Sequence, residues 1–346
     1  MNSKFLSIAA SVSVSILLSQ NVNARPLTVV GFGGAAQNAQ RVSMFDPFSK
    51  QENLQIVDDT YNGGLAKIKA MVDSNAVSWD VVQLEDPDLI QACEEGIIEP
   101  VDWDRVGGKD NFLDSAISEC GVGHIIWSYV ISYNKDNLVV GPQSWADFWD
   151  VDKFPGKRGL RKGAKANLEF ALMADGVSPK DVYDVLETEE GVNRAFAKLE
   201  ELKSHVQWWE AGAQPPEWLA SGDVVMTTAY NGRISNAVKE GKNFEIVWNG
   251  HVYTVDSWAV VKGSENKDKA FDFIGFSSSK EPALIYQQYM PYGIPNKLVI
   301  EATPADIANK LPTSPNNISV GLRENTEFWV DYQDELNERF NAFVVK

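Results

Sequence analysis

Short apolar strands alternate with helical segments along most of this 346-residue chain. Leu27–Phe32 and Trp79–Leu84 read as apolar strands, and residues 37–52 read as a helix between them. The alternation resumes in the second half of the chain, where a strand at 224–230 precedes a helix at 232–240. Strands that alternate with helices predict a mostly parallel α/β sheet.

The alternation falls into two blocks, roughly 25–133 and 134–250, and the remaining chain is too short for a third domain. Further strands are predicted at 244–248 and 253–261. The economical arrangement sends the last segment back to complete both blocks, so crossing strands join two lobes at a hinge. The cleft between the lobes is then the expected ligand site. The predicted N-terminal lobe is 25–133 plus about 256–301, and the C-terminal lobe is about 134–255 plus 302–346.

The first 24 residues have the pattern of a secretory signal peptide. Lys4 precedes a stretch of apolar and small residues that runs to Leu18, and Val22-Asn23-Ala24 forms a small-residue cleavage site. The apolar stretch is short and broken by serines, which argues against a membrane anchor. The sequence therefore predicts cleavage after Ala24 and a location in the periplasm.

Cysteine usage agrees with secretion. Cys93 and Cys120 are the two cysteines of the chain. An oxidising compartment permits a disulfide between them, and the alternative is a pair of buried thiols. We expect the disulfide.

The charge balance limits the partners. With 31 basic and 48 acidic residues, the chain carries a net charge of −17. Such a surface repels nucleic acid and gives no basic patch for anionic lipid. Cationic and mixed-charge ligands remain, and 11 tryptophans supply more indole than a core needs.

Two predicted strands end in polar side chains. Glu85, Asp86 and Asp88 follow the strand at 79–84, and ligands of open α/β sheets bind outside the carboxyl ends of strands. We take Asp88 as the cap of the next helix, and Glu85 or Asp86 as the acid of the site. The strand at 224–230 likewise delivers Tyr230 and, one turn later, Arg233.

Asp256 lies inside an otherwise apolar strand. A buried carboxylate needs a partner, which is either a cationic group of a ligand or Arg233. Tyr253 and Trp258 flank the position, and aromatic faces beside a carboxylate suit an ammonium group. We favour the ligand. Tyr230, Trp258, Tyr292 and either Trp127 or Trp209 are the expected apolar walls.

Motifs for catalysis are missing from the sequence. His124, His205 and His251 have no metal-binding spacing, and there is no G-x-S-x-G elbow. The basic run Lys157–Lys165 is typical of a solvated loop. We therefore expect no catalytic residues, no metal and no cofactor. A secreted enzyme with a Ser-His-Asp site built from distant residues is the alternative of another class.

Seven short motifs carry a resemblance over the whole mature chain. The chain resembles the periplasmic solute-binding proteins of ABC importers, in their spermidine/putrescine-binding branch. The matching segments are Phe45-Asp-Pro-Phe48, Trp79-Asp-Val-Val82, Gly96-Ile-Ile-Glu-Pro-Val-Asp102, Phe154-Pro-Gly-Lys157, Ala229-Tyr-Asn-Gly232, Val255-Asp-Ser257 and Tyr292-Gly-Ile-Pro295.

This resemblance implies a two-lobed fold that closes on its ligand, a receptor for a polyamine, and an inner-membrane permease as partner. It also implies a role for several residues. Asp256 would bind an amine, Tyr230 would stack on the ligand, and Tyr292 would lie near it. The loop from Phe32 through Gly34 to Gln37 would face the ligand. We expect a monomer.

The chain departs from that family at positions that bear on the ligand. Lys162, Lys165 and Asn167 stand near the places where polyamine binders carry acids, although Glu85 and Asp86 offer replacements from the first lobe. Arg233 stands where putrescine binders carry an aspartate. A buried arginine opposes a dication and suits a carboxylate. A zwitterion such as γ-aminobutyrate or a betaine is therefore the alternative to a polyamine.

Overall fold

The computed structural model describes residues 25–345, so the predicted signal peptide lies outside the described residues. A nine-stranded sheet runs through this part of the chain in the order β2-β1-β3-β8-β4-β7-β5-β6, and β9 pairs with β8. The strands are β1 (Leu27–Gly31), β2 (Ile56–Thr60), β3 (Val81–Glu85), β4 (Val122–Asn134), β5 (Arg158–Arg161), β6 (Val206–Trp209), β7 (Met226–Tyr230), β8 (Phe244–Val260) and β9 (Leu322–Arg323).

Two long strands connect the halves of the sheet. β1 pairs in parallel with β2 and β3, and β5 pairs in parallel with β6 and β7. Between these two parallel blocks lie β8 and β4, with 17 and 13 residues, which pair antiparallel with each other and with β3 and β7. We call the block with β1 to β3 the first lobe and the block with β5 to β7 the second lobe. β4 and β8 cross between the lobes.

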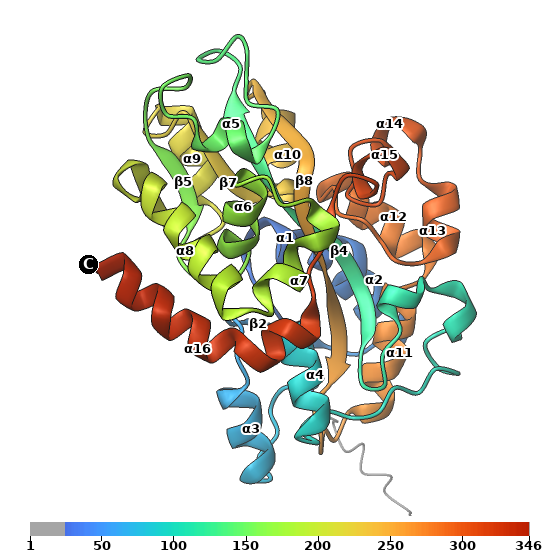
Figure 1. Ribbon diagram of the computed structural model, residues 1–346. Coiled ribbons are helices and arrows are strands. Elements are labelled where there is room, and N and C mark those ends of the chain that lie inside the picture. The colour runs from blue at the N-terminus through green and yellow to red at the C-terminus, as the bar shows by residue number, and fades with distance from the viewer. Residues whose placement is uncertain (1–24, 346) are drawn as a thin grey trace, which may run out of the picture.

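Helices cover both lobes (Figure 1). In that view α5, α8 and α9 lie at the upper left, α3, α4 and α11 lie in the lower part, and α12 to α15 lie at the right. The last helix, α16, packs on α4 of the first lobe. It is also hydrogen-bonded to the second lobe, because Lys203 donates to the Phe343 carbonyl and Arg339 of α16 donates to Asn193 Oδ1. The helices are α1 (Gly34–Gln40), α2 (Asp46–Glu52), α3 (Ala66–Asp73), α4 (Asp86–Glu94), α5 (Trp145–Trp149), α6 (Asn167–Ala174), α7 (Val182–Leu186), α8 (Glu189–Leu202), α9 (Gln214–Ser221), α10 (Asn231–Lys239), α11 (Lys267–Ser277), α12 (Lys280–Tyr289), α13 (Lys297–Ala302), α14 (Ala305–Ala308), α15 (Pro315–Ile318) and α16 (Thr326–Val345).

Two segments differ from the sequence-based expectation. The strands expected at 244–248 and 253–261 are one continuous strand, β8, because Gly250 adopts a φ of 70° and lets the strand bend while its pairing with β4 continues. The basic run expected to be a solvated loop contains β5 instead. Arg158 is fully buried there, because its guanidinium donates to the backbone carbonyls of Phe148, Asp150 and Gly156.

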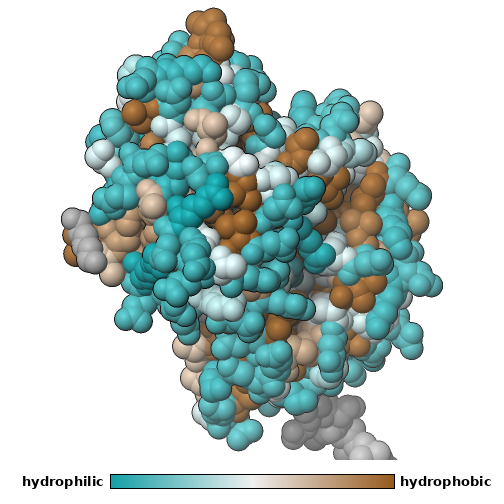
Figure 2. All heavy atoms as spheres, viewed as in Figure 1, coloured by the Kyte–Doolittle hydropathy of each residue, from teal (hydrophilic) through white to brown (hydrophobic). Residues whose placement is uncertain are grey.

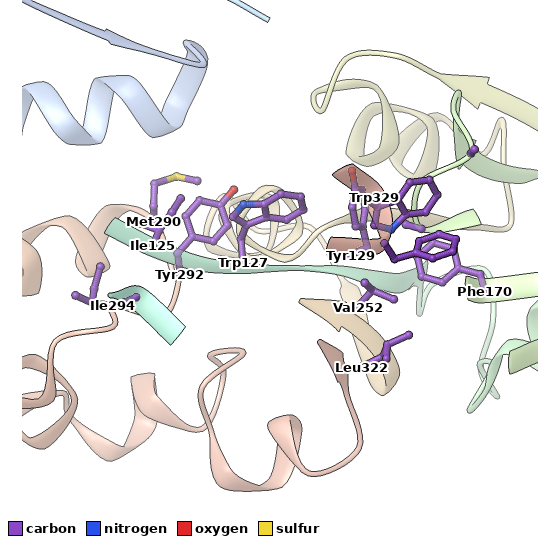
Figure 3. Packing of buried hydrophobic residues seen from close by; sticks show 14 of the residues in the cluster. Ile125, Trp127, Tyr129, Phe170, Val252, Met290, Tyr292, Ile294, Leu322 and Trp329 are labelled. Carbon is purple, nitrogen blue, oxygen red and sulfur yellow. The ribbon is translucent and has the colours of Figure 1, made fainter. Parts of the chain in front are cut away.

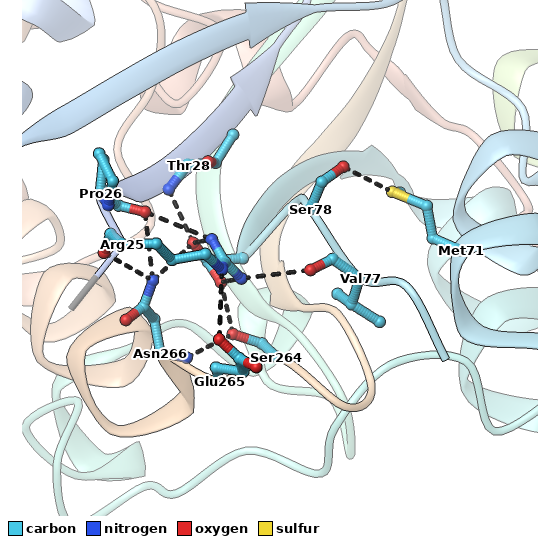
Figure 4. A network of polar contacts seen from close by, with 10 residues as sticks. Arg25, Pro26, Thr28, Met71, Val77, Ser78, Ser264, Glu265 and Asn266 are labelled. Atoms are coloured by element: carbon cyan, nitrogen blue, oxygen red, sulfur yellow. Dashed lines mark hydrogen bonds and ion pairs between the residues drawn. The ribbon is translucent and has the colours of Figure 1, made fainter. Parts of the chain in front are cut away.

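A buried polar network fixes the edge of the first lobe where β1 and β3 begin (Figure 4). The Asp80 carboxylate has no exposed surface and accepts two hydrogen bonds from the Arg25 guanidinium, at 2.6 and 2.7 Å. It also accepts from the Thr28 amide, the Ser264 hydroxyl and the Asn266 side chain. Asp80 is therefore fully satisfied by the protein itself.

The predicted cysteine pair is joined in the structure. Cys93 and Cys120 form a disulfide with their Cα atoms 5.7 Å apart. The bridge ties the end of α4 to the segment before β4, so it closes a loop within the first lobe. A cross-link of this kind restricts the unfolded chain.

The face shown in Figure 2 is mostly hydrophilic, in keeping with the net charge of −17. One apolar projection lies at the top of that view, over the loop that precedes α5, where Val139 and Val140 are exposed. Among the described residues, no helix combines the length and the apolarity that crossing a membrane requires.

Candidate ligand-binding site

A cavity of about 690 Å³ lies between the two lobes. This volume falls in the range of small-molecule sites, roughly 300–1,000 Å³. Both lobes and both crossing strands contribute side chains to its wall. The lining residues are Phe32, Gly34, Ala36, Gln37, Gln40, Asn62, Gln83, Glu85, Ile125, Trp127, Arg161, Glu210, Ala211, Gly212, Ala213, Gln214, Tyr230, Arg233, Asp256 and Tyr292.

Asp256 provides a buried carboxylate in the cavity wall. Its exposed fraction is 3%, and its two oxygens accept one hydrogen bond each, from Trp127 Nε1 at 2.6 Å and from Gln83 Nε2 at 2.6 Å. Both donors are neutral, and no basic side chain of residues 25–345 forms an ion pair with this carboxylate. Burial, reinforced by the neighbouring Glu85, raises the pKa of Asp256 well above its usual range.

Glu85 lies opposite Asp256 in the antiparallel pairing of β3 with β8. Unlike Asp256, it is paired with a cation, because Lys165 Nζ lies 2.7 Å from Glu85 Oε2. Burial works to raise the pKa of Glu85, but Lys165 and Arg161 outweigh it and lower that pKa. Glu85 therefore stays ionised, with Lys165 neutralising its charge.

Arg233 brings positive charge to the cavity from the first turn of α10. Among the described residues its guanidinium makes no ion pair, and its buried Nε has no hydrogen-bond partner. The internal pair with Asp256 that the sequence left open is therefore not formed. Gly34, at a φ of 63°, lets the guanidinium approach the first lobe, because a Cβ at this position would lie 3.1 Å from Arg233 Nη1.

Aromatic rings form the apolar walls. Ile125, Trp127 and Tyr129 stand on one face of β4, with Tyr292 beside Trp127 (Figure 3). The Trp127 and Tyr230 rings meet edge to face, with centroids 5.0 Å apart. Tyr292 lies directly over Gly232, where any Cβ would come within 2.5 Å of the ring. These rings can cover the apolar chain of a ligand.

The structure brings nine of the twelve predicted binding residues to the cavity, and three others do not line it. Trp258 lies deeper, where its ring packs on His124 and on Phe273 of α11. Trp209 has no exposed surface, because its indole turns inward and donates to Thr228 Oγ1. The nine are Phe32, Gly34, Gln37, Glu85, Trp127, Tyr230, Arg233, Asp256 and Tyr292.

Asp86 is the third predicted binding residue that does not line the cavity, and it lies at the start of α4. Burial, with Glu324 nearby, raises the pKa of Asp86 to about 7. The expected capping role of Asp88 is also not observed, since its carboxylate accepts from the Gly64 amide of another segment. Of Glu85 and Asp86, the two candidates for the site acid after β3, Glu85 is the one that lines the cavity.

Sequence reasoning missed several polar residues of the site. Arg161 lines the cavity and donates to the Tyr129 hydroxyl. Gln40 donates to Gln83 at 2.8 Å, so a chain of amides supports the carboxylate of Asp256. No motif marks glutamines of this kind. The basic run around Arg161 is evident in the sequence, but the short strand β5 that it forms depends on pairing with the distant strands β6 and β7.

The described residues contain no group of three or more His, Cys, Asp or Glu side chains placed to hold a metal ion. A cleft between two lobes that presents an unpaired carboxylate, an arginine and aromatic walls is that of a receptor for small molecules. The comparisons with known proteins agree. Residues 43–313 match the family model described as bacterial extracellular solute-binding protein, and the chain belongs to this family.

Relatives and solved structures cover nearly the whole chain. The gamma-aminobutyric acid-binding protein of Pseudomonas aeruginosa is 51% identical over 320 residues, which is 92% of this chain and 91% of that protein. The spermidine/putrescine-binding periplasmic protein of Salmonella typhimurium is 23% identical over 304 residues, 82% of each chain. The resemblance to the polyamine branch is therefore distant.

Two solved structures share the two-lobed fold at 30% identity. MotA of A. tumefaciens B6, in complex with glucopine, has a TM-score of 0.85 and covers 92% of this chain and 100% of its own. A GABA receptor, Atu4243, has a TM-score of 0.84 and covers 92% of this chain and 98% of its own. The predicted fold, two lobes with a hinge of crossing strands and a ligand cleft, is confirmed.

Proposed function

We propose that the protein is a periplasmic receptor for a small ω-amino acid such as γ-aminobutyrate, which it delivers to an ABC importer in the inner membrane. The observation that carries this proposal is the pair of unsatisfied opposite charges in one cavity. Within residues 25–345, Asp256 is a buried carboxylate without a cationic partner, and Arg233 is a guanidinium without an anionic partner. A zwitterion supplies both missing partners.

Each end of the ligand has a matching group. An ammonium group beside Asp256 would neutralise the carboxylate that burial otherwise disfavours in its charged form. A carboxylate beside Arg233 would accept two parallel hydrogen bonds from the guanidinium. Trp127, Tyr230 and Tyr292 would enclose the carbon chain between the two charges. Closing the lobes would exclude water and strengthen both charge contacts.

The charges of the cavity favour this ligand over a polyamine, the first expectation from the sequence. A diamine needs two free carboxylates, yet Glu85 is already paired with Lys165. Two arginines, Arg161 and Arg233, also line the cavity and would repel a second ammonium group. The 51% identity to a γ-aminobutyrate-binding protein, against 23% to a polyamine binder, supports the same choice.

Arg233→Ala tests the proposal. We expect the dissociation constant for γ-aminobutyrate, measured by isothermal titration calorimetry, to rise about 100-fold, because a desolvated carboxylate loses its bidentate partner. Arg233→Lys should have a dissociation constant between those of the wild type and Arg233→Ala, since lysine keeps the positive charge but lacks the planar guanidinium. Arg194→Ala is the matched control, because Arg194 pairs with Asp175 on the surface of α8.

The analogue n-butylamine separates a direct contact from a structural effect. It has no carboxylate, so it should bind weakly to the wild type and equally weakly to Arg233→Ala. Unchanged γ-aminobutyrate affinity in Arg233→Ala would contradict the proposal, as would turnover of γ-aminobutyrate, which would indicate an enzyme.

A further inference from the structure

Glu85 and Asp256 face each other across β3 and β8, and both line the ligand cavity. Two carboxylates in this arrangement would suit a diamine if both were free. Building on the proposed function, we propose that Lys165 determines the charge class of the ligand. By neutralising Glu85, it leaves Asp256 as the carboxylate available to the ligand, so that the site takes one ammonium group rather than two.

Lys165 acts from behind the cavity wall. It does not line the main cavity, but it lines a smaller one of about 260 Å³ that shares Asn62, Glu85 and Arg161 with it. The side chains of Lys165 and Glu85 are 12% and 22% exposed, so water screens their attraction weakly. The pair also joins the lobes, since Glu85 ends β3 of the first lobe and Lys165 follows β5 of the second.

A second acid holds Lys165 in its charged form. The Glu324 carboxylate has no exposed surface, and its Oε1 lies 3.7 Å from Lys165 Nζ. Burial alone would lower the pKa of Lys165, but Glu324 and Glu85 together raise it. The ammonium group of Lys165 therefore stays charged beside Glu85.

The backbone around Lys165 is held in an unfavourable conformation. Ala166 has a φ of 70°, which an L-residue other than glycine rarely adopts. The Asn167 side chain donates to the carbonyls of Arg161 and Gly163, and the Ala164 amide donates to Asn337 of α16. Strain that the surroundings maintain in this way is typical of segments that position a functional group.

Arg161 reinforces the effect of Lys165. It precedes Lys165 in the same segment, lines both cavities and helps to lower the pKa of Glu85. Removing Lys165 alone would leave this arginine in place. We therefore expect the charge preference to weaken in such a variant without reversing completely.

The test is isothermal titration calorimetry of Lys165→Met, which keeps the length of the side chain and removes its charge. We expect the affinity for putrescine to rise about tenfold over wild type, because the freed Glu85 can accept a second ammonium group. The affinity for γ-aminobutyrate should change less. Lys165→Arg should keep the wild-type preference. Lys69→Met is the matched control, because Lys69 is exposed, pairs with Glu95, and neither residue lines either cavity.

The double variant Lys165→Met/Glu85→Gln shows whether the gain passes through Glu85, and we expect it to abolish the gain. Lys165→Gln replaces Lys165→Met if the latter fails to fold, as judged by circular dichroism. Folded variants without a gain for putrescine would overturn the proposal. So would equal losses of both ligands, or misfolding of both variants, since each would make Lys165 purely structural. Failure of wild type to bind any ω-amino acid would instead contradict the proposed function.

Discussion

Two buried aspartates, one just before β3 and one within β8, differ in their partners. Asp80, at the start of β3, accepts hydrogen bonds from the Arg25 guanidinium and from three further groups of the protein. Asp256, in β8 at the cavity, accepts from two neutral donors and pairs with no cation of the described chain. A carboxylate that the protein satisfies completely contributes to stability. A buried carboxylate that lacks a counter-charge is a candidate for binding a cationic group of a ligand.

The largest expected effect is the loss of binding in Asp256→Asn. The amide is similar in shape but carries no charge, so the ligand ammonium would be buried without a counter-ion. We expect the affinity for γ-aminobutyrate to fall by at least about 100-fold in calorimetry, with the fold intact. Wild-type affinity in this variant would contradict the role given to Asp256.

Asp80→Ala should produce the opposite pattern. Removing this carboxylate leaves Arg25 and several buried donors without an acceptor, so we expect a loss of about 2–3 kcal/mol in the free energy of unfolding, measured with denaturant. Binding of γ-aminobutyrate, measured where the variant is folded, should stay close to wild type. A selective loss of binding would erase the contrast between the two aspartates.

A smaller effect is expected from Trp127→Phe. This change keeps an aromatic wall but removes the indole N–H that donates to Asp256 Oδ1. We expect the affinity for γ-aminobutyrate to fall about tenfold, which is the typical contribution of a hydrogen bond to a charged group. Trp258→Phe is the matched control, because the Trp258 indole N–H has no hydrogen-bond partner in the described part of the chain and Trp258 does not line the cavity.

The smallest effect concerns the stability of the unliganded protein as a function of pH. Because the pKa of Asp256 is raised in the folded state, the folded protein holds a proton that the unfolded chain releases above about pH 4. Wild type should therefore lose stability relative to Asp256→Asn as the pH rises above that point. Thermal unfolding between pH 4 and 8 measures the difference, and a constant difference would mean that the pKa of Asp256 is unshifted.

The sequence predicted the fold and the two central charges. Alternating strands and helices indicate the α/β class, and a charged residue within an apolar strand stands out, as Asp256 does. The residues around Lys165 could not be predicted, because a basic run next to glycines is typical of a solvated loop. The burial of the segment around Lys165 depends on contacts with α16 and with Glu324, both distant in sequence.

The errors among the aromatic residues have a similar origin. Strand periodicity places Trp258 on the same face as Asp256, but it does not tell how far along the strand the cavity extends. α11 covers the position of Trp258. The preference for a polyamine over a zwitterion came from the resemblance to the polyamine-binding branch, and the sequence could not reveal that Lys165 neutralises Glu85.

The most direct test compares two ligands that share a four-carbon chain and differ in one terminal group. γ-Aminobutyrate and putrescine would be titrated into the wild-type protein by isothermal titration calorimetry under the same conditions. The account predicts that γ-aminobutyrate binds with micromolar or better affinity, about −8 kcal/mol, and that putrescine binds at least about 100-fold more weakly. Putrescine binding as tightly as γ-aminobutyrate, or more tightly, would contradict it.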